Sequence, residues 1–334
     1  MDISFLDVLF TVFSLIILII PGYLLVKTKL LGQSAGNALS TVVLYVCQPA
    51  LAFIGFQKTN YNSNIAINML IVAGLAIFLH LVMFGIVWLV TIRAGKTPKV
   101  NVMKFASMFG NCGYMGLPFL KSLFEGQGEA VYGEILIYGA IVIAVFNLFC
   151  WTLGVYMVSG DKKEVSVKKI LLNPTIIAVV LGFLSFVIFQ KPIADVVVAG
   201  NFFDRLFESL MKGLNFLADT VTPLSMIVIG IRLANVKFTR LFTEKTTYVV
   251  SFTKLVVMSV ITILSVAFLS ISIEVKNVLF FLLSMPCAAN TALFAIRYGS
   301  DESVGSIYVL FSTIASILTI PLMYMLFNWV IGLV

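Results

Sequence analysis

The chain has 334 residues, of which 60% are hydrophobic and only 11% are charged. Soluble domains are closer to half apolar and a quarter charged, so this composition excludes an ordinary soluble fold and indicates an integral membrane protein. The net charge of +7 does not indicate nucleic-acid binding, because the basic residues concentrate in alternate loops between predicted membrane spans.

Ten apolar stretches are long enough to cross a bilayer, which takes roughly 20 residues of helix. The first has no positively charged start and no small-residue cleavage site, so we expect a spanning helix and not a removable signal peptide. The predicted fold class is therefore an all-α membrane protein with ten transmembrane helices. The predicted spans are 4–26, 35–56, 65–92, 102–124, 131–158, 173–190, 209–231, 247–270, 276–297 and 303–332.

Lysine and arginine are unevenly divided between the loops that join these spans. By the positive-inside rule, the richer loops face the cytoplasm and both termini face outward. We therefore expect a multi-pass protein of the plasma (inner) membrane. The richer loops, after spans one, three, five, seven and nine, hold Lys27, Lys29, Arg93, Lys96, Lys99, Lys104, Lys162, Lys163, Lys168, Lys169, Arg232, Lys237, Arg240, Lys245 and Arg297. The alternate loops hold Lys58, Lys121, Lys191, Arg205, Lys212 and Lys276.

No soluble domain is predicted between the spans. Residues 159–172 form a short cytoplasmic linker, and the mixed polarity of 191–210 predicts a segment along the outer membrane interface. The four cysteines all lie in apolar stretches, so we expect neither disulfides nor a metal site.

The chain contains a weak internal repeat, as membrane transporters often do. Pro49 in span two and Pro223 in span seven are related by an offset that also carries Tyr45 to Asp219, Gln48 to Thr222 and His80 to Lys254. Each half, 1–158 and 173–334, holds five spans. Because five is an odd number, the second half starts on the opposite side of the membrane, and the repeats are inverted.

Two spans at matching places in the halves are interrupted. "FGNCGYMGLPFL", residues 109–120, contains three glycines and Pro118, and its counterpart "LSMPCAANTALF" contains Pro286. A single break is equally well explained as a kink or a close-packing site. A matched pair indicates a binding site near the bilayer midplane, because freed backbone groups are tolerated there only against protein or a water-filled cavity.

The half-helices that begin after these breaks predict an anionic ligand. Helix N-termini present unpaired N–H groups and the positive end of the dipole. Pro118 suits a first helical turn, and Asn290 or Thr291 suits a cap. Lys254 adds a positive charge deep in span eight.

Polar residues line one face of span two and of span seven. Asp219 is a candidate proton carrier or sodium ligand, because a carboxylate at the bilayer centre costs at least about 2.5 kcal/mol. The alternative is a buried structural partner for Lys254 or for a helix backbone. His80 is either a packing residue or a proton relay, and Asn147 either lines the site or bonds across helices. The two faces hold Asn37, Thr41, Tyr45 and Gln48, and Asn215, Asp219 and Thr222.

Over essentially its whole length the sequence resembles the auxin efflux carrier family, which includes plant auxin exporters and bacterial carboxylate permeases. "GNCGYMGLPFL", "PCAANTALFAIRYGSD", "LADTVTPLSMIVIGIRL" and the lysine of span eight carry the resemblance. It implies a fold related to sodium/proton antiporters and bile-acid symporters, with broken helices four and nine crossing at the substrate site. It also implies a scaffold of spans 1, 2, 6 and 7, a transport domain of spans 3–5 and 8–10, and a homodimer formed through the scaffold. The short 159–172 linker favours a bacterial-type permease over a plant exporter.

These observations predict a secondary transporter of a small organic anion, a malate-like or auxin-like carboxylate, working by elevator-type alternating access with H⁺ or Na⁺ as possible coupling ion. The alternatives are a cation antiporter on the same fold and a membrane sensor that does not transport. An enzyme is not expected, since the sequence has no H-E-x-x-H or G-x-G-D motif, and neither is a cofactor. The predicted substrate-binding residues are Asn111, Gly113, Tyr114, Gly116, Pro118, Asn147, Lys254, Pro286, Asn290 and Thr291. The predicted coupling or gating residues are Asp219, Gln48, Tyr45, Thr222 and His80.

Overall fold

The computed structural model describes residues 3–32, 34–166, 168, 171–193, 202–234, 236 and 238–333. Within these ranges the chain is helical, and the only strand-like pairing is an isolated antiparallel bridge between Gly110 and Cys287. The all-helical class expected from the sequence is confirmed.

Each predicted span coincides with one helix or with consecutive helical segments. The first half contains α1 (Phe5–Ile17), α2 (Ile19–Lys27), α3 (Ala35–Val42), η1 (Val43–Cys47), α4 (Gln48–Gly55), α5 (Ser63–Thr91), α6 (Pro98–Met108), η2 (Cys112–Gly116), α7 (Leu117–Phe124), α8 (Glu129–Phe149), η3 (Cys150–Gly154), α9 (Val155–Ser159) and η4 (Lys162–Glu164). The second half contains α11 (Pro174–Phe189), α13 (Phe202–Leu233), α14 (Phe238–Thr243), α15 (Thr246–Phe252), η5 (Thr253–Val257), α16 (Met258–Ala267), α17 (Ile273–Leu283), α18 (Thr291–Arg297) and α19 (Glu302–Ile331).

Among the described residues, seven continuous helical stretches are long and apolar enough to cross a membrane. A shorter apolar helix, α11, occupies the sixth predicted span. The fourth and ninth predicted spans are interrupted. A break separates α6 from η2 and α7 in the fourth span, and another separates α17 from α18 in the ninth.

Local sequence explains where several helices begin. Asn62, Thr97 and Asn173 accept hydrogen bonds from backbone N–H groups in the first turns of α5, α6 and α11, which satisfies donors that have no partner inside the helix. Pro98 and Pro174 follow two of these caps, where a missing N–H costs nothing.

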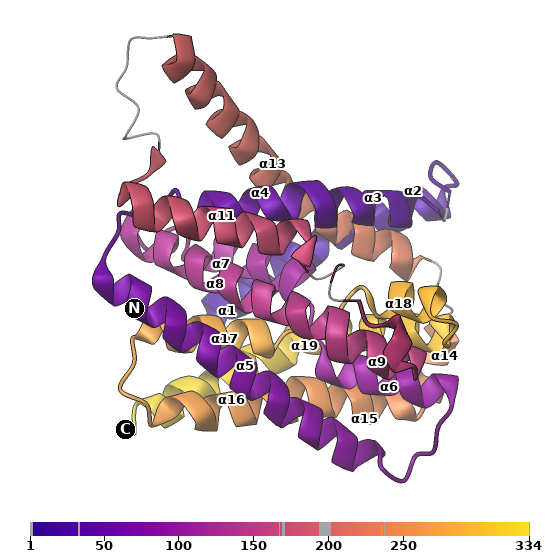
Figure 1. Ribbon diagram of the computed structural model, residues 1–334. Helices are drawn as coiled ribbons and strands as arrows, with labels where there is room; N and C mark the ends of the chain where they lie inside the picture. The colour runs from indigo at the N-terminus through magenta and orange to yellow at the C-terminus, as the bar shows by residue number, and fades with distance from the viewer. Residues whose placement is uncertain are drawn as a thin grey trace.

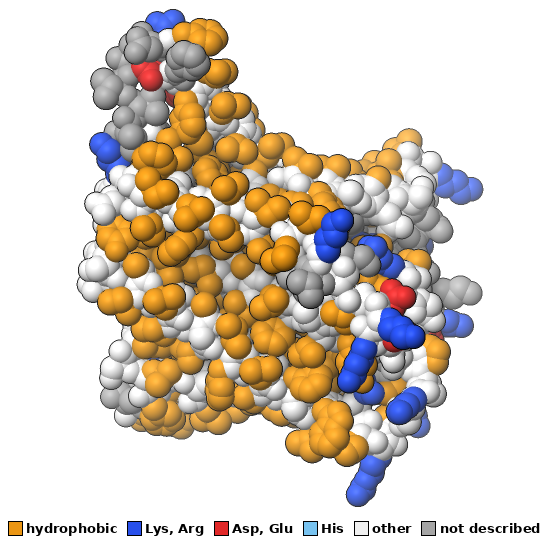
Figure 2. Space-filling model, in the orientation of Figure 1, with side chains coloured by type: hydrophobic (Ala, Val, Ile, Leu, Met, Phe, Trp, Pro, Cys, Tyr) orange, Lys and Arg blue, Asp and Glu red, His pale blue; other side chains and the backbone are white. Residues whose placement is uncertain are grey.

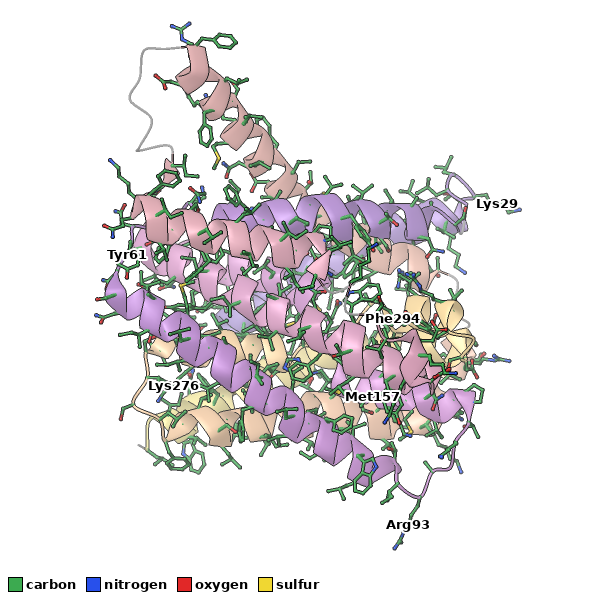
Figure 3. The ribbon with its side chains drawn as sticks, in the orientation of Figure 1. Lys29, Tyr61, Arg93, Met157, Lys276 and Phe294 are labelled. Atoms are coloured by element: carbon green, nitrogen blue, oxygen red, sulfur yellow. The ribbon has the colours of Figure 1, made fainter. Side chains whose placement is uncertain are left out.

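The helices run roughly side by side between two ends of different charge. Lys29 and Arg93 lie at one end, and Tyr61 and Lys276 lie at the other (Figure 3). Both chain termini lie at the same end of the molecule as Tyr61 (Figure 1). Figure 2 shows lysine and arginine side chains gathered at the opposite end and an apolar surface between the ends. The charge asymmetry predicted for the loops is therefore visible in the folded molecule.

Helix α13 differs from its prediction at one end. It is continuous from Phe202 despite Pro223, and its first turns project beyond the rest of the molecule (Figure 1). The part of the predicted interfacial segment from 202 onward is thus the start of this helix, while residues 194–201 lie outside the described residues. The reason is the uninterrupted run of helix-compatible residues from 202 into the predicted span, with no glycine or proline to end a helix before 213.

Candidate functional site

The two interrupted spans meet at their breaks. Phe109 is extended (φ −96°, ψ 122°), and the N–H of Asn111 donates to the carbonyl of Pro286 at 2.7 Å. The N–H of Ala288 donates to the carbonyl of Phe109 at 2.9 Å. The two breaks thus satisfy part of each other's backbone at a point where both are buried. We call residues 109–111 and 284–290 the crossover.

Two details of the predicted breaks are corrected. In span four the chain leaves the helix at Phe109–Asn111 and becomes helical again at Cys112, so Gly113, Gly116 and Pro118 lie inside η2 and α7 and are not the break itself. The N–H groups of Asn111 and Ala288 are engaged by carbonyls, and that of Cys287 by Ser312 Oγ at 3.0 Å. Those three amides are not free to hold an anion, because two carbonyls and one hydroxyl already accept from them.

Close packing accounts for the glycines that the sequence places around the break in span four. A Cβ on Gly113 would lie 2.2 Å from Gln48 Nε2, and one on Gly116 would lie 2.6 Å from a Leu282 methyl carbon. A Cβ on Gly110 would lie 2.8 Å from Lys254 Cε. At each position a side chain larger than glycine would require the end of a neighbouring side chain to move.

Gln48 and Asn111 carry buried hydrogen-bond donors next to the crossover. Gln48 Nε2 and Asn111 Nδ2 have no acceptor among the described residues, and both side chains are almost fully buried. Buried amide groups are costly to leave unpaired, so the two donors mark a place where an acceptor is expected. Tyr114 connects η2 to α3 and α13, since its hydroxyl donates to the Ser40 carbonyl and its carbonyl accepts from Ser225 Oγ.

Lys254 also reaches the crossover. Its side chain is 1% exposed, and its ammonium donates to the carbonyl of Leu283, the last residue of α17, at 2.7 Å. A cation at the C-terminal carbonyls of a helix is favoured by the helix dipole. Lys254 therefore contacts the backbone of span nine, and it is not among the residues that line the cavity beside the crossover.

That cavity has a volume of about 240 Å³. It contains three of the predicted site residues, Tyr45, Asn147 and Asn290, together with Asn37 and Thr41 from the predicted polar face of span two. Phe294 also lines it, and Figure 3 shows Phe294 between the centre of the molecule and the cationic end. The remaining lining residues are Ser40, Leu44, Trp151, Asn173, Pro174, Thr175, Leu293 and Arg297.

A second, more open cavity of about 370 Å³ shares Tyr45, Trp151, Asn173 and Arg297 with the first. It adds Lys168, and we call the two adjoining cavities the path. The described residues that line the path include the cations Arg297 and Lys168 but no aspartate or glutamate. The path thus combines a positive mouth with a neutral, amide-rich and aromatic interior.

Four predicted residues lie elsewhere. His80 is buried, with Nδ1 2.7 Å from the Ala76 carbonyl and its ring stacked on Phe149, as in the packing alternative. Asp219 is largely exposed and forms an ion pair with Lys121, so the alternative of a buried partner for Lys254 is wrong. Thr222 is half-buried on α13, outside the cavity lining. Thr291 closes the turn before α18 by bonding the Ala288 carbonyl.

Asn290 occupies the predicted cap position of α18, but its side chain makes no capping hydrogen bond. It lines the cavity instead. Asn290 therefore forms part of the cavity wall and does not cap the helix that follows it.

Sequence reasoning missed Arg297 and Arg232 because both were counted as topology signals at span ends. Arg232 donates to the Ala289 carbonyl and, at 2.9 Å, to Ser40 Oγ, so it ties α13 and α3 to the crossover. Trp151 and Asn173 also line the cavity and were missed because they belong to no recognisable sequence motif. In the described part of the chain η1, η2, η3 and η5 are π-helical, whereas η4 is a 3₁₀ helix. Such segments often occur at functional sites, and three of the four contain Tyr45, Trp151 and Lys254.

Comparison with known protein families decides the class. The family described as "Membrane transport protein" matches residues 7–168 and 161–324. The chain belongs to this family. The match confirms the resemblance to the auxin efflux carriers that the sequence motifs indicated.

Relatives of this membrane transport protein family are similar over nearly the whole chain. An "Uncharacterized transporter" of Methanothermobacter thermautotrophicus is 25% identical, covering 93% of this chain and 96% of the relative. An "Uncharacterized transporter" of Methanocaldococcus jannaschii is 24% identical over the same shares. A protein of Rhizobium meliloti named "Putative malonate transporter" is 24% identical, covering 92% of each chain. The chain is thus a multi-pass membrane transporter.

Proposed function

We propose that this transporter is a secondary active carrier of a small organic anion, a carboxylate such as malonate or malate, or an auxin-like monocarboxylate. The observation that carries the proposal is the chemistry of the path beside the crossover. Arg297 and Lys168 attract an anion at its mouth, and Asn290 offers an amide group inside. Asn147 has a second amide hydrogen beyond the one that it donates to the Ile143 carbonyl, and the described lining residues include no carboxylate. Hydrogen bonds from these cations or amides to a carboxylate are stronger than hydrogen bonds between two neutral groups.

The unpaired donors of Gln48 and Asn111 support the same ligand class. Asn111 is part of the crossover and Gln48 packs against Gly113, two residues farther along the chain; neither lines the cavity. A carboxylate is acceptor-only when ionised, so it would complement these N–H groups, whereas a metal cation would not. The relative named for malonate is consistent with a carboxylate substrate.

The proposed architecture is two inverted repeats of five spans each, related as in other transporters with broken helices. The antiparallel meeting of the two breaks supports it. The cavity lies between spans two and six on one side and spans five and nine on the other, which is where a scaffold and a moving transport domain would face each other. The cationic end would face the cytoplasm and the termini would face outward, in the plasma (inner) membrane.

The test is ligand binding to purified protein, read as a shift in melting temperature. Malonate, malate and indole-3-acetate are the probes, and sodium chloride is the reference. Arg297→Gln should weaken the affinity for the active carboxylate by about tenfold to a hundredfold, because hydrogen bonds to charged groups contribute about 1.5–3 kcal/mol. Arg93→Gln, an exposed cation at the same end, is the matched control and should bind as the parent does. The anion proposal fails if no carboxylate stabilises the protein while sodium or protons alone are carried.

A further inference from the structure

A second buried polar feature lies away from the substrate path, between α6 and α15. Both helices begin at the cationic end, where Lys99 Nζ is 2.7 Å from Glu244 Oε1. Both end at the crossover, where Lys254 lies against Gly110. The two helices pack against each other and against α19, so residues at intermediate positions on α6 and α15 lie at similar depths.

Three hydroxyl groups are distributed between the cationic end and the crossover. Thr247 and Ser251 lie four residues apart on one face of α15, Lys254 follows in η5, and Ser107 lies on α6 shortly before the crossover. All four side chains are almost fully buried. We call Thr247, Ser251 and Ser107 the hydroxyl file.

The hydroxyls of the file lack the hydrogen-bond partner that buried hydroxyls in helices commonly have. Thr247 Oγ1, Ser251 Oγ and Ser107 Oγ have no partner among the described residues. A buried helical serine or threonine commonly bonds a carbonyl one turn earlier, as Ser259 and Thr262 do farther along the same span. Unpaired buried hydroxyls in an otherwise packed region indicate ordered water.

The file connects groups that can exchange protons at both ends. At the cationic end, Glu244 Oε1 accepts from Thr246 Oγ1, which lies 2.7 Å from the hydroxyl of Tyr308. At the inner end, the ammonium of Lys254 is buried, and within the described part of the chain no carboxylate forms an ion pair with it. A buried charge without a counterion is costly to maintain.

We propose that the hydroxyl file and the water it binds carry protons between the cationic end and the amine of Lys254, on a route separate from the substrate path. Lys254 releases a proton to the nearest water and becomes a neutral amine, while the file passes one proton on to the cationic end. The reverse transfer recharges it. This inference rests on the proposed transport function and assigns H⁺ as its coupling ion. The other titratable groups around Lys254 are Cys112, Cys287 and His80.

The experiment uses protein in proteoliposomes that enclose a pH-sensitive dye. A malonate gradient drives the internal pH change, and counterflow of labelled malonate at equal pH is measured in parallel. Thr247→Val with Ser251→Ala should slow the pH change by about tenfold to a hundredfold and leave counterflow within about twofold of the parent. Ser259→Ala with Thr262→Val is the matched control and should leave both rates unchanged. Counterflow without any pH change in the parent, or an unchanged pH response in the file variant, would overturn the proton route.

Hydrogen–deuterium exchange keeps the file testable if malonate is not carried at all. Absence of counterflow for every carboxylate would count against the proposed function alone. The file predicts that amides of residues 246–254 exchange about tenfold faster in the parent than in the Thr247→Val, Ser251→Ala variant, because removing the hydroxyls removes the water. Equal exchange in the two proteins would show a dry, structural cluster and would refute the inference.

Discussion

Single residues at the crossover are fixed by how closely neighbouring chains approach. Gly110 is the sharpest case, since its missing side chain leaves room for the Lys254 Cε and Nζ atoms and lies near the Met285 carbonyl. The hydrogen bond from Lys254 to Leu283 depends on that room. Lys254 and Gly110 therefore act as one structural unit.

Gly110→Ala should lower the stability of the folded protein by about 1–3 kcal/mol, the usual cost of overpacking. The new Cβ would fall 2.8 Å from Lys254 Cε, so the lysine would have to leave its position. Gly126→Ala, with open space around the added carbon, should be close to neutral. Melting temperatures of the two variants in detergent check this, and equal melting temperatures would mean that Lys254 moves aside at little cost.

The pair of Lys99 and Glu244 makes a prediction about pH. Partial burial opposes ionisation of Glu244, but hydrogen bonds from Lys99 and Thr246 outweigh it and lower the pKa of Glu244 below its usual 4.5. A lowered folded-state pKa gives stability that is present above the unfolded-state pKa and lost as the pH falls through the folded-state value. The contribution is at most about 1 kcal/mol for so accessible a pair.

Glu244→Gln should therefore melt below the parent at pH 7, and the gap should close as the pH falls below about 4. Glu208→Gln is the control, since Glu208 forms an exposed pair with Lys212 within one helix. Melting curves over this pH range measure the effect. A gap that stays constant down to pH 3 would assign the loss to packing and not to charge.

At the residue scale the structure brings only some of the predicted site residues together. Asn147, Asn290 and Tyr45 line one cavity, and their roles in binding and gating stay predictions. Asp219 looked buried because its span is apolar, but it pairs with Lys121 at the surface of the molecule. Whether a polar residue faces a cavity, a neighbour or the surface depends on how each helix is rotated, which the polar faces of spans two and seven do not determine.

At the scale of elements, α2 and α13, both in the proposed scaffold, make a very close contact. A Cβ on Gly22 would lie 2.1 Å from the Ile227 carbonyl oxygen, and one on Gly230 would lie 2.0 Å from that of Ile19. Small residues let helix backbones approach in membranes, where packing and not the hydrophobic effect drives association.

Gly230→Ala should destabilise the protein by at least about 1–3 kcal/mol, because backbone atoms and not a flexible side chain must move. Gly74→Ala on α5 is the matched helical control, with nothing within 4 Å of the added carbon. It should be neutral or stabilising, since alanine favours a helix by about 1 kcal/mol over glycine. Chemical denaturation of both variants checks the prediction, and equal stabilities would contradict the proposed role of this contact.

The helix ranges were predictable because hydrophobic runs of span length and capping residues such as Asn62 and Asn173 are local signals. The π-helical segments were not predictable. Each inserts a residue into the helical register, as η5 does at Lys254, and this depends on packing between segments far apart in sequence. The exact place of the break in span four was missed for the same reason, since Gly113 and Gly116 serve contacts with Gln48 and Leu282.

At the scale of the whole molecule, the proposed alternating access requires the two groups of spans to move against each other. The ion pair between Lys121 on α7 and Asp219 on α13 joins the two groups near the end opposite the cationic loops. It must separate if the transport domain moves along the scaffold.

Cysteines placed at Lys121 and Asp219 and joined by a short thiol-reactive linker should abolish carboxylate transport, and reducing the linker should restore it. The four native cysteines are buried and should contribute little background labelling. Cysteines at Glu208 and Lys212, an exposed pair within α13, form the control pair and should leave transport intact when linked, because both lie on one helix. Full transport with positions 121 and 219 linked would show that these spans do not separate.

The central claim is that a carboxylate crosses the membrane through the path beside the crossover. Counterflow of labelled malonate and malate into proteoliposomes tests it most directly, because a sensor that only binds its ligand gives no counterflow. The account predicts uptake that unlabelled carboxylate inside the vesicles drives and that Arg297→Gln reduces about tenfold or more, with Arg93→Gln as the unaffected control. Carboxylate binding without counterflow, or counterflow indifferent to Arg297, would contradict it.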